Sequence, residues 1–191
     1  MRLFKTRKKL KLFLLVLSFF VFLIALLVYS QPIQPTKIYG ITFAASAAEA
    51  FGLDPKEVYT ALLDDLGFRH IRISAYWDRV ERQQGKLDFS ELDWQVEEAE
   101  NRGAKLILAV GRKTPRWPEC HIPGWVEQLP TKEQDEKLFS FVKQVIERYK
   151  GLSAITTWQV ENEPFLPFGE CESKSASILD REIALVRSLD S

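Results

Sequence analysis

Residues 105–110, Lys-Leu-Ile-Leu-Ala-Val, are the stretch that decides the fold. Five of the six are apolar, and a short continuous apolar run is typical of a strand buried on both faces of a parallel sheet. Amphipathic helices are predicted on either side of it, over 92–103 and 131–151, each ending at a glycine. A buried strand between two such helices indicates an α/β domain.

The same alternation continues in both directions along the chain. Further strands are predicted over 37–44, 69–75 and 154–160, and further helices over 54–67 and 178–189. Asp54 is a typical helix N-cap, and Thr131 begins a capping-box pattern. The resulting order, β-α-β-α-β-α-β-α, predicts a parallel sheet whose successive strands are connected by helices.

Two architectures satisfy this order. One is an open, doubly wound sheet, and the other is a (β/α)₈ TIM barrel of which the chain forms the first four βα units. Residues 42–46, Thr-Phe-Ala-Ala-Ser, follow the first strand and carry no glycine-rich phosphate loop. That absence disfavours a nucleotide-binding open sheet.

Charge is distributed unevenly. The whole chain has 26 basic and 26 acidic residues, but residues 1–11 hold six of the basic ones and none of the acidic ones. The remainder is therefore mildly acidic, which argues against a nucleic acid partner, because phosphate binding needs a basic face. With two histidines in the sequence, no metal site is expected, and no cofactor is predicted.

The N-terminal segment has the pattern of an export or anchoring signal. Residues 12–29 form an apolar run that follows the basic cluster. We expect residues 1–30 to be a transmembrane anchor or a cleaved signal peptide, with the domain outside the cytoplasm. Residues 31–36 contain two prolines and are expected to form a linker to the domain at 37–191.

The end of the predicted fourth strand carries the most informative residues, because ligands of parallel α/β folds bind at the carboxyl ends of strands. Residues 158–165 read Trp-Gln-Val-Glu-Asn-Glu-Pro-Phe. Alternation along the strand predicts that Trp158 faces the helices and Gln159 the opposite side. Pro164 cannot donate a ladder hydrogen bond, so the alternation is expected to break just before it.

This octapeptide resembles the fourth-strand signature of the retaining glycoside hydrolases built on (β/α)₈ barrels. That clan contains the family-five cellulases, the family forty-two β-galactosidases and the family thirty-nine xylosidases. Residues 67–77, Gly-Phe-Arg-His-Ile-Arg-Ile-Ser-Ala-Tyr-Trp, are similar to the clan's second strand, which commonly carries an arginine and then an aromatic residue. The resemblance is nearest to family five and covers nearly the whole body of the chain.

The resemblance implies roles for three residues. Glu163 would be the general acid/base, Asn162 would hydrogen-bond the sugar hydroxyl beside the reacting carbon, and Arg72 would lie beneath the site and hold the catalytic carboxylates. One carboxyl group must give a proton to the leaving oxygen near neutral pH and later, as a carboxylate, activate water. The alternatives are a surface ion pair for Glu163 and an ion-pairing strand residue for Arg72.

A long loop, residues 111–130, is expected after the third strand, and loops of this length are often functional. Trp117 and Trp125 in this loop, together with Trp77, are candidates for stacking on sugar rings. The alternative is a small hydrophobic cluster that stiffens the loop. Cys120 in this loop and Cys171 after the fourth strand follow neighbouring strands of the expected barrel. A disulfide between them is therefore predicted, with two free thiols as the alternative.

The same resemblance implies that a second carboxylate is needed as the nucleophile, and the clan takes it from the seventh strand. A full barrel needs about 250 residues, which residues 36–191 do not supply. We therefore expect the N-terminal half of a glycosidase that hydrolyses O-glycosidic bonds of an extracellular oligo- or polysaccharide by a retaining mechanism. Such a chain needs a C-terminal half barrel as its partner and is inactive alone. The alternative is a membrane-anchored carbohydrate-binding module without catalysis.

Overall fold

The computed structural model describes residues 2–29, 37–171 and 175–190 of the chain. The chain divides into two compact units, Met1–Lys37 and Ile38–Ser191. The expected linker, residues 31–36, lies outside the described residues.

The first unit contains helix α1 (Arg2–Tyr29). Throughout the residues that the structure describes, no helix combines the length and the apolar character needed to cross a membrane. The transmembrane helix expected over 12–29, and with it the membrane as a partner, is therefore not supported.

The second unit is built on a parallel sheet of four strands, β1 (Ile41–Thr42), β2 (His70–Ser74), β3 (Lys105–Val110) and β4 (Ile155–Val160). The strands lie in the order β1-β2-β3-β4, so each pairs with the next strand along the chain. A doubly wound sheet reverses its strand order at a switch point, and the described strands contain no such reversal. The doubly wound alternative is therefore wrong, and a TIM-barrel-like sheet is confirmed for these four strands.

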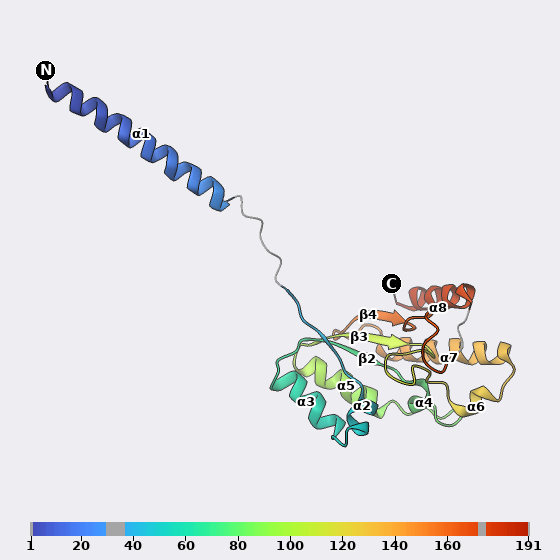
Figure 1. Ribbon diagram of the computed structural model, residues 1–191. Helices are drawn as coiled ribbons and strands as arrows, with labels where there is room; N and C mark the ends of the chain where they lie inside the picture. The colour runs from blue at the N-terminus through green and yellow to red at the C-terminus, as the bar shows by residue number, and fades with distance from the viewer. Residues whose placement is uncertain (1, 30–36, 172–174, 191) are drawn as a thin grey trace. The chain divides into compact units, whose positions relative to one another are not determined.

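A long helix follows each strand, and Figure 1 shows these helices ranged along the sheet. They are α3 (Pro55–Asp64), α5 (Ser90–Asn101), α7 (Thr131–Tyr149) and α8 (Ala176–Leu189). Three short helices were not expected from the sequence, namely α2 (Ala45–Ala50), α4 (Trp77–Val80) and α6 (Gly124–Glu127). Helices of one or two turns are too short to show the apolar periodicity on which sequence prediction relies.

The two expected helix caps differ in outcome. The carboxylate of Asp54 accepts hydrogen bonds from the backbone N–H groups of Lys56, at 2.7 Å, and Glu57, at 3.4 Å, so this N-cap is confirmed. The capping box expected at Thr131 is wrong. Thr131 is already the first helical residue of α7, and Pro130, which occupies the cap position, has no side-chain donor or acceptor.

The first strand is shorter than expected. Ile38 and Tyr39 are 70% and 72% exposed and precede the strand. Pairing with β2 begins only at Ile41, which lies opposite Ile71. The residues before Ile41 therefore have no part in the paired strand.

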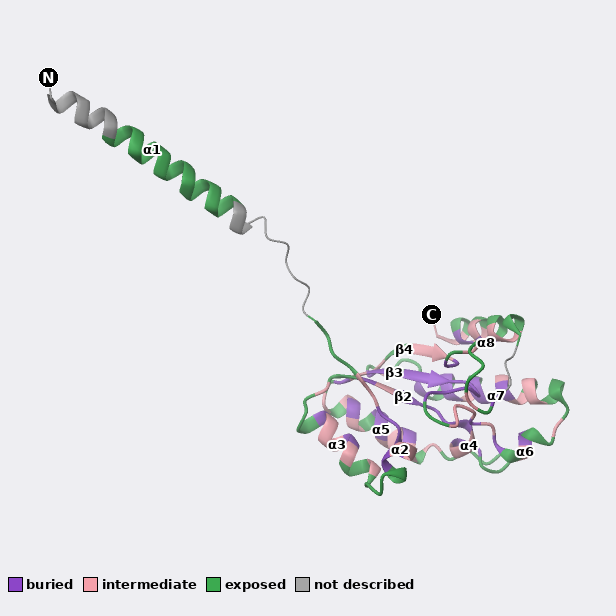
Figure 2. Ribbon diagram, in the orientation of Figure 1, coloured by how far each residue is buried: buried purple, intermediate pink, exposed green. Residues whose placement is uncertain are grey.

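The hydrophobic core lies between the sheet and its helices. Ile71 and Ile73 of β2 and Leu106 and Leu108 of β3 are at most 1% exposed and belong to this core. Figure 2 shows the buried inner sides of the helices that pack here. The two isoleucines of β2 therefore face the helices.

The opposite face of the sheet is not covered by the described residues. Ile107, in the middle of β3, is 39% exposed. It shares this face with Arg72 and Gln159, because the strand register places Arg72 opposite Ile107 and Gln159 opposite Ala109. The expectation that β3 is buried on both faces is therefore wrong at Ile107, whereas Ala109, further along the same face, is fully buried.

The loops that follow β3 and β4 are linked covalently. We call residues 111–123 the β3 loop and residues 161–171 the β4 loop. The predicted disulfide between Cys120 and Cys171 is present and joins the two loops. Backbone hydrogen bonds add to this link, since the N–H of Glu170 donates to the carbonyl of Pro118 at 3.0 Å.

Two buried carboxyl groups meet where α8 packs against the end of β4. Glu182 of α8 is 2% exposed and Glu161 is 5% exposed. Burial raises the pKa of Glu182 to about 9, and the charge and hydrogen bonding of Glu161 act in the same direction. Burial also raises the pKa of Glu161, while the Arg112 guanidinium opposes that rise. One proton shared by the pair, on Glu182, relieves the repulsion between the two groups.

Loss of the disulfide is expected to lower the free energy of unfolding by about 4 kcal/mol. The closed loop spans a sequence separation of 51, and a cross-link of that length removes about this much chain entropy from the unfolded state. Denaturant unfolding of the oxidised chain should be compared with that of a Cys120→Ser, Cys171→Ser double variant. A reductant should destabilise the wild type to the level of the double variant and leave the double variant unchanged. Equal stability of all samples would contradict the prediction.

The pKa of Glu182 predicts a pH dependence of stability. A carboxyl group whose pKa is higher in the folded than in the unfolded state takes up a proton on folding, so its contribution is complete below the unfolded value of 4.5 and is lost as the pH rises toward about 9. Glu182→Gln should remove a slope of up to about 1.4 kcal/mol per pH unit from the unfolding free energy in this window. Glu147→Gln, at an exposed position of α7, is the control and should keep the slope.

Candidate active site

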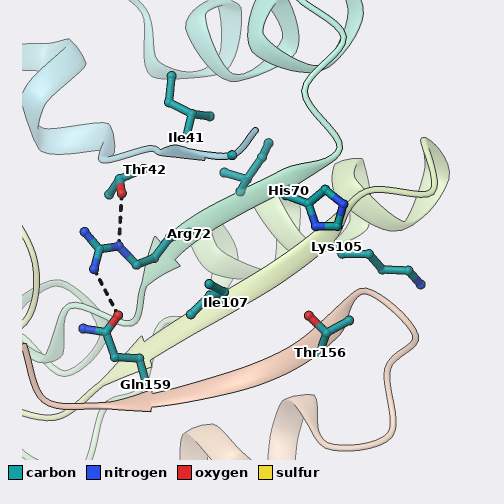
Figure 3. Close-up of a pocket in the computed structure, with 10 residues that line it drawn as sticks. Ile41, Thr42, His70, Arg72, Lys105, Ile107, Thr156 and Gln159 are labelled. Atoms are coloured by element: carbon teal, nitrogen blue, oxygen red, sulfur yellow. Dashed lines mark hydrogen bonds between the residues drawn. The ribbon is translucent and has the colours of Figure 1, made fainter. Parts of the chain in front are cut away.

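A row of hydrogen bonds runs across the uncovered face of the sheet toward the carboxyl ends of its strands. Arg72 is at the centre, and its Nε donates to Oγ1 of Thr42 at 3.0 Å. Its Nη1 donates to Oε1 of Gln159 at 3.1 Å, and Figure 3 shows Arg72 between these two partners. Gln159 then donates from Nε2 to Oδ1 of Asn162 at 3.1 Å. The row thus connects β1, β2 and β4 to the first residues of the β4 loop.

A cavity of about 320 Å³ opens on the same face. Arg72 and Gln159 lie at one end of it, near the carboxyl ends of the strands, as Figure 3 shows. His70 and Lys105, the first residues of β2 and β3, line the opposite end. Asn162 and Glu163, the candidate catalytic residues that follow β4, are not among the residues that line this cavity and lie beyond its Arg72 end.

The regular backbone of β4 breaks where the sequence predicted. Glu161 and Glu163 have positive φ values, 59° and 47°. Non-glycine residues rarely adopt this conformation, which costs of the order of 1 kcal/mol each and persists only when surrounding contacts hold it. The break leaves Asn162 buried and Glu163 exposed to solvent.

The side chains of Asn162 and Glu163 have groups free for a ligand. In the orientation that accepts from Gln159, the amide nitrogen of Asn162 has no hydrogen-bond partner in the described part of the chain. The carboxylate of Glu163 makes no hydrogen bond or ion pair with any described residue. A neutral donor and a free carboxyl group therefore follow each other along the chain.

Arg72 lies where the sequence placed it, but its partners differ from those expected. Within the described residues it binds a hydroxyl and an amide oxygen and no carboxylate. It reaches Asn162 through Gln159 and makes no direct hydrogen bond to Glu163. The role of holding the catalytic carboxylates stays a prediction.

Glu161 has a structural role. Its carboxylate accepts from the backbone N–H groups of Arg112, at 3.1 Å, and Lys113, at 2.6 Å. Its Oε1 is also 4.0 Å from Nε of Arg112. These contacts hold the end of β4 against the beginning of the β3 loop.

Two of the three tryptophans expected to bind sugar do not face a ligand. Trp77 is 1% exposed, stacks on Phe141 of α7 in the core and donates from Nε1 to Glu81 at 2.9 Å. Trp125 packs against the same core and donates from Nε1 to the Glu81 carbonyl at 2.9 Å. These two assignments are wrong because the rings lie on the helix side of the sheet. The alternative, a hydrophobic cluster beneath the loop, is correct for them.

Trp117 remains a candidate for sugar binding. Its ring is 65% exposed and meets Phe168 of the β4 loop edge to face, with 5.9 Å between the ring centroids. The pair therefore presents aromatic surface from both loops that flank the end of β4. Sequence reasoning missed Phe168, although it lies only five residues after Glu163.

A buried lysine of the β3 loop was also missed. Lys113 is 3% exposed, and its Nζ donates to the carbonyls of Glu163, at 3.0 Å, and Leu166, at 2.6 Å. A lysine in a polar loop gives no sequence signal of burial. Among the described residues, no group of three histidine, cysteine or acidic side chains is arranged to hold a metal ion.

Comparison with solved structures supports the fold. The chain is similar to GH5_18 from Streptomyces cattleya in complex with GlcNAc, with a TM-score of 0.61 and 12% identity, over 80% of this chain and 41% of that one. It is also similar to xylanase 10B from Thermotoga petrophila RKU-1 in complex with xylobiose, with a TM-score of 0.58 and 17% identity, over 80% of this chain and 46% of that one. Both likenesses indicate a TIM-barrel-like glycosidase fold.

The sequence comparisons give the family. Endo-1,4-beta-xylanase 3 from Hypocrea jecorina is 29% identical to this chain over 130 residues, which are 67% of this chain and 35% of the relative. The chain thus spans about a third of the length of the curated relatives it matches. The family model for glycosyl hydrolase family 10 matches residues 39–182, which refines the expected likeness to family five. The chain belongs to glycosyl hydrolase family 10.

Proposed function

We propose that this chain provides the acid/base part of a glycosidase that hydrolyses β-1,4-linked xylan by a retaining double displacement. The observation that carries the proposal is the hydrogen-bonded row from Thr42 through Arg72 and Gln159 to Asn162, which ends beside the exposed carboxyl group of Glu163. The xylan substrate is suggested by the xylanase relatives of the same family.

Glu163 would transfer the protons of the reaction, and Asn162 would hydrogen-bond the sugar. The carboxyl group of Glu163 gives its proton to the glycosidic oxygen as the bond to the anomeric carbon breaks. The second carboxylate, the nucleophile, forms a bond to that carbon in this first step. In the second step the Glu163 carboxylate takes a proton from water, and the water oxygen attacks the anomeric carbon and displaces the nucleophilic carboxylate. The free amide nitrogen of Asn162 donates to the hydroxyl beside that carbon, where a hydrogen bond strengthens in the transition state.

The second carboxylate would come from a segment that completes the barrel. A retaining enzyme needs its nucleophile about 5 Å from the acid/base, and Arg72 binds no carboxylate among the described residues. The uncovered sheet face and the partial coverage of the relatives support an N-terminal half barrel that needs a C-terminal half. This half alone would then be inactive.

We place the domain outside the cytoplasm. The Cys120–Cys171 disulfide supports this, because structural disulfides persist mainly in oxidising compartments. Such a location gives access to an extracellular polysaccharide, as the sequence analysis expected.

The decisive variant is Glu163→Ala in a protein that joins this chain to the segment with the nucleophile. Hydrolysis of xylan should fall about 10²–10⁴-fold, the usual contribution of a general acid/base. Azide should restore turnover of an aryl xylobioside, because azide attacks without losing a proton. The product should be a xylobiosyl azide of retained configuration. Glu170→Ala, an exposed position in the same loop, is the control and should hydrolyse xylan at the wild-type rate.

Two outcomes would contradict parts of this proposal. Xylan hydrolysis by Glu163→Ala at the wild-type rate would contradict the acid/base role. Turnover of an aryl xylobioside by the present chain alone, abolished in Glu163→Gln, would instead contradict the missing nucleophile and indicate that a second copy supplies it.

Trp117→Ala is expected to weaken binding of xylohexaose about 2- to 13-fold, because aromatic contacts of this kind are worth about 0.5–1.5 kcal/mol. Calorimetric titration of the present chain measures the loss. Phe51→Ala is the control, since Phe51 is 81% exposed, caps the C-terminus of α2 and lies outside both loops. If Trp117→Ala binds xylohexaose with the affinity of the wild type, the pair of Trp117 and Phe168 does not bind the sugar.

The second candidate function is a carbohydrate-binding module without catalysis. The exposed pair of Trp117 and Phe168 favours it, since this pair needs no nucleophile. It predicts that Glu163→Gln leaves xylohexaose binding unchanged and that the completed barrel hydrolyses no xylan.

A further inference from the structure

Lys113 has a combination of burial and partners that the proposed chemistry does not use. The residue is 3% exposed, and its ammonium group lies against backbone carbonyls of the β4 loop. No carboxylate of the described residues is within ion-pair distance of this ammonium. A buried cation without an anionic partner is costly, and here carbonyl oxygens alone replace its hydration.

Lys113 makes hydrogen bonds to four residues of the β4 loop. Its Nζ donates to the carbonyls of Glu163 and Leu166. Its backbone carbonyl accepts from the N–H of Asn162 at 2.6 Å, and its own N–H donates to Oε2 of Glu161 at 2.6 Å. One residue of the β3 loop thus fixes the backbone on both sides of the candidate acid/base.

Gly111, two residues before Lys113, permits the close approach of the β3 loop to the side chain of Glu161. Its φ is 131°, and a Cβ placed on it would lie 2.7 Å from the carboxyl carbon of Glu161. Glycine therefore lets the β3 loop turn directly over the Glu161 carboxylate, and this turn brings Lys113 alongside the β4 loop.

Besides the ammonium of Lys113, the middle of the β4 loop is held by two short-range backbone hydrogen bonds and by the contact of Phe168 with Trp117. Phe165, Leu166 and Phe168 are about half exposed or more and do not belong to the core. The two hydrogen bonds of the ammonium are charge-assisted, and charge-assisted hydrogen bonds are stronger than neutral ones. One of them is made to the carbonyl of Glu163 itself, so it acts directly on the residue that adopts the left-handed conformation.

We propose that Lys113 is the positioning residue of the acid/base, holding the backbone of Glu163 so that its carboxyl group points to the sugar. This inference rests on the proposed role of Glu163. Lys113 acts through the backbone of the β4 loop and does not touch the substrate.

The first test needs no catalytic activity. Amide hydrogen exchange of the full chain is compared for wild type, Lys113→Met, Lys113→Arg and Lys143→Met, the last removing an exposed ammonium of α7 that pairs with Glu147 at 3.7 Å. In Lys113→Met the amides of Asn162, Leu166 and Phe168 should exchange at least 10-fold faster, while the core amides of β2 and β3 keep their wild-type rates. Lys113→Arg should return the loop to within about threefold of wild type, and Lys143→Met should match wild type.

A shorter neutral variant covers the case in which Lys113→Met does not fold. Lys113→Gln keeps one donor group and no charge, and exchange should still accelerate several-fold in the β4 loop alone. Wild-type exchange of the β4 loop in a folded Lys113→Met or Lys113→Gln would overturn the inference. Equal acceleration throughout the core would overturn it too, because that result describes a general structural role.

The second test separates this inference from the proposed function. In the completed enzyme, Lys113→Met should lower kcat on xylan about 10- to 100-fold with KM nearly unchanged, because a displacement of about 1 Å at a catalytic group has this effect. Lys113→Arg should recover most of kcat. If Glu163→Ala abolishes hydrolysis but Lys113→Met has wild-type kcat, the positioning inference is wrong. If Glu163→Ala has no effect while the exchange result holds, the proposed function is wrong and Lys113 merely orders the β4 loop.

Discussion

Pairing between β3 and β4 is the constraint on which the site depends. Val110 lies opposite Val160, so both strands end at the same level of the sheet. Both following loops then leave the sheet side by side, within reach of a disulfide, a buried lysine and an aromatic pair that cross between them. The candidate acid/base owes its place to this register. A shift of one residue would reverse the faces of the strand and remove Gln159 from Arg72.

The two faces of the sheet differ in polarity and in what they contribute to the protein. The face toward the helices is apolar, is fully buried in β2 and β3 and partly buried in β4, and supplies the hydrophobic stabilisation of the unit. The other face carries the polar row centred on Arg72, whose members are partly exposed and directional in their bonding. Stability and chemistry are thus separated by the two-residue period of the strands. This separation explains why Trp77, on the helix side, belongs to the core.

Regular elements were predictable from the sequence because each has a local signal. The strand period placed Gln159 on the face away from the helices, and the neighbouring strand ends led to the disulfide. Trp77 and Trp125 were assigned wrongly, since residue type alone does not tell which side of a sheet a loop ring packs against. Lys113 was missed because its partners are backbone carbonyls 50 and more positions away along the chain. The roles of Arg72, Asn162 and Glu163 came from a family resemblance and not from any periodicity.

The contact between Gly111 and Glu161 limits how this sequence can diverge. Any side chain at 111 would collide with the carboxyl group at 161. A shorter acid at 161 would draw its oxygens away from the two amides they accept from. Neither replacement alone preserves the contact, so a viable variant needs a change at 111 and a change at 161 together. We therefore expect these two positions, fifty residues apart, to change together.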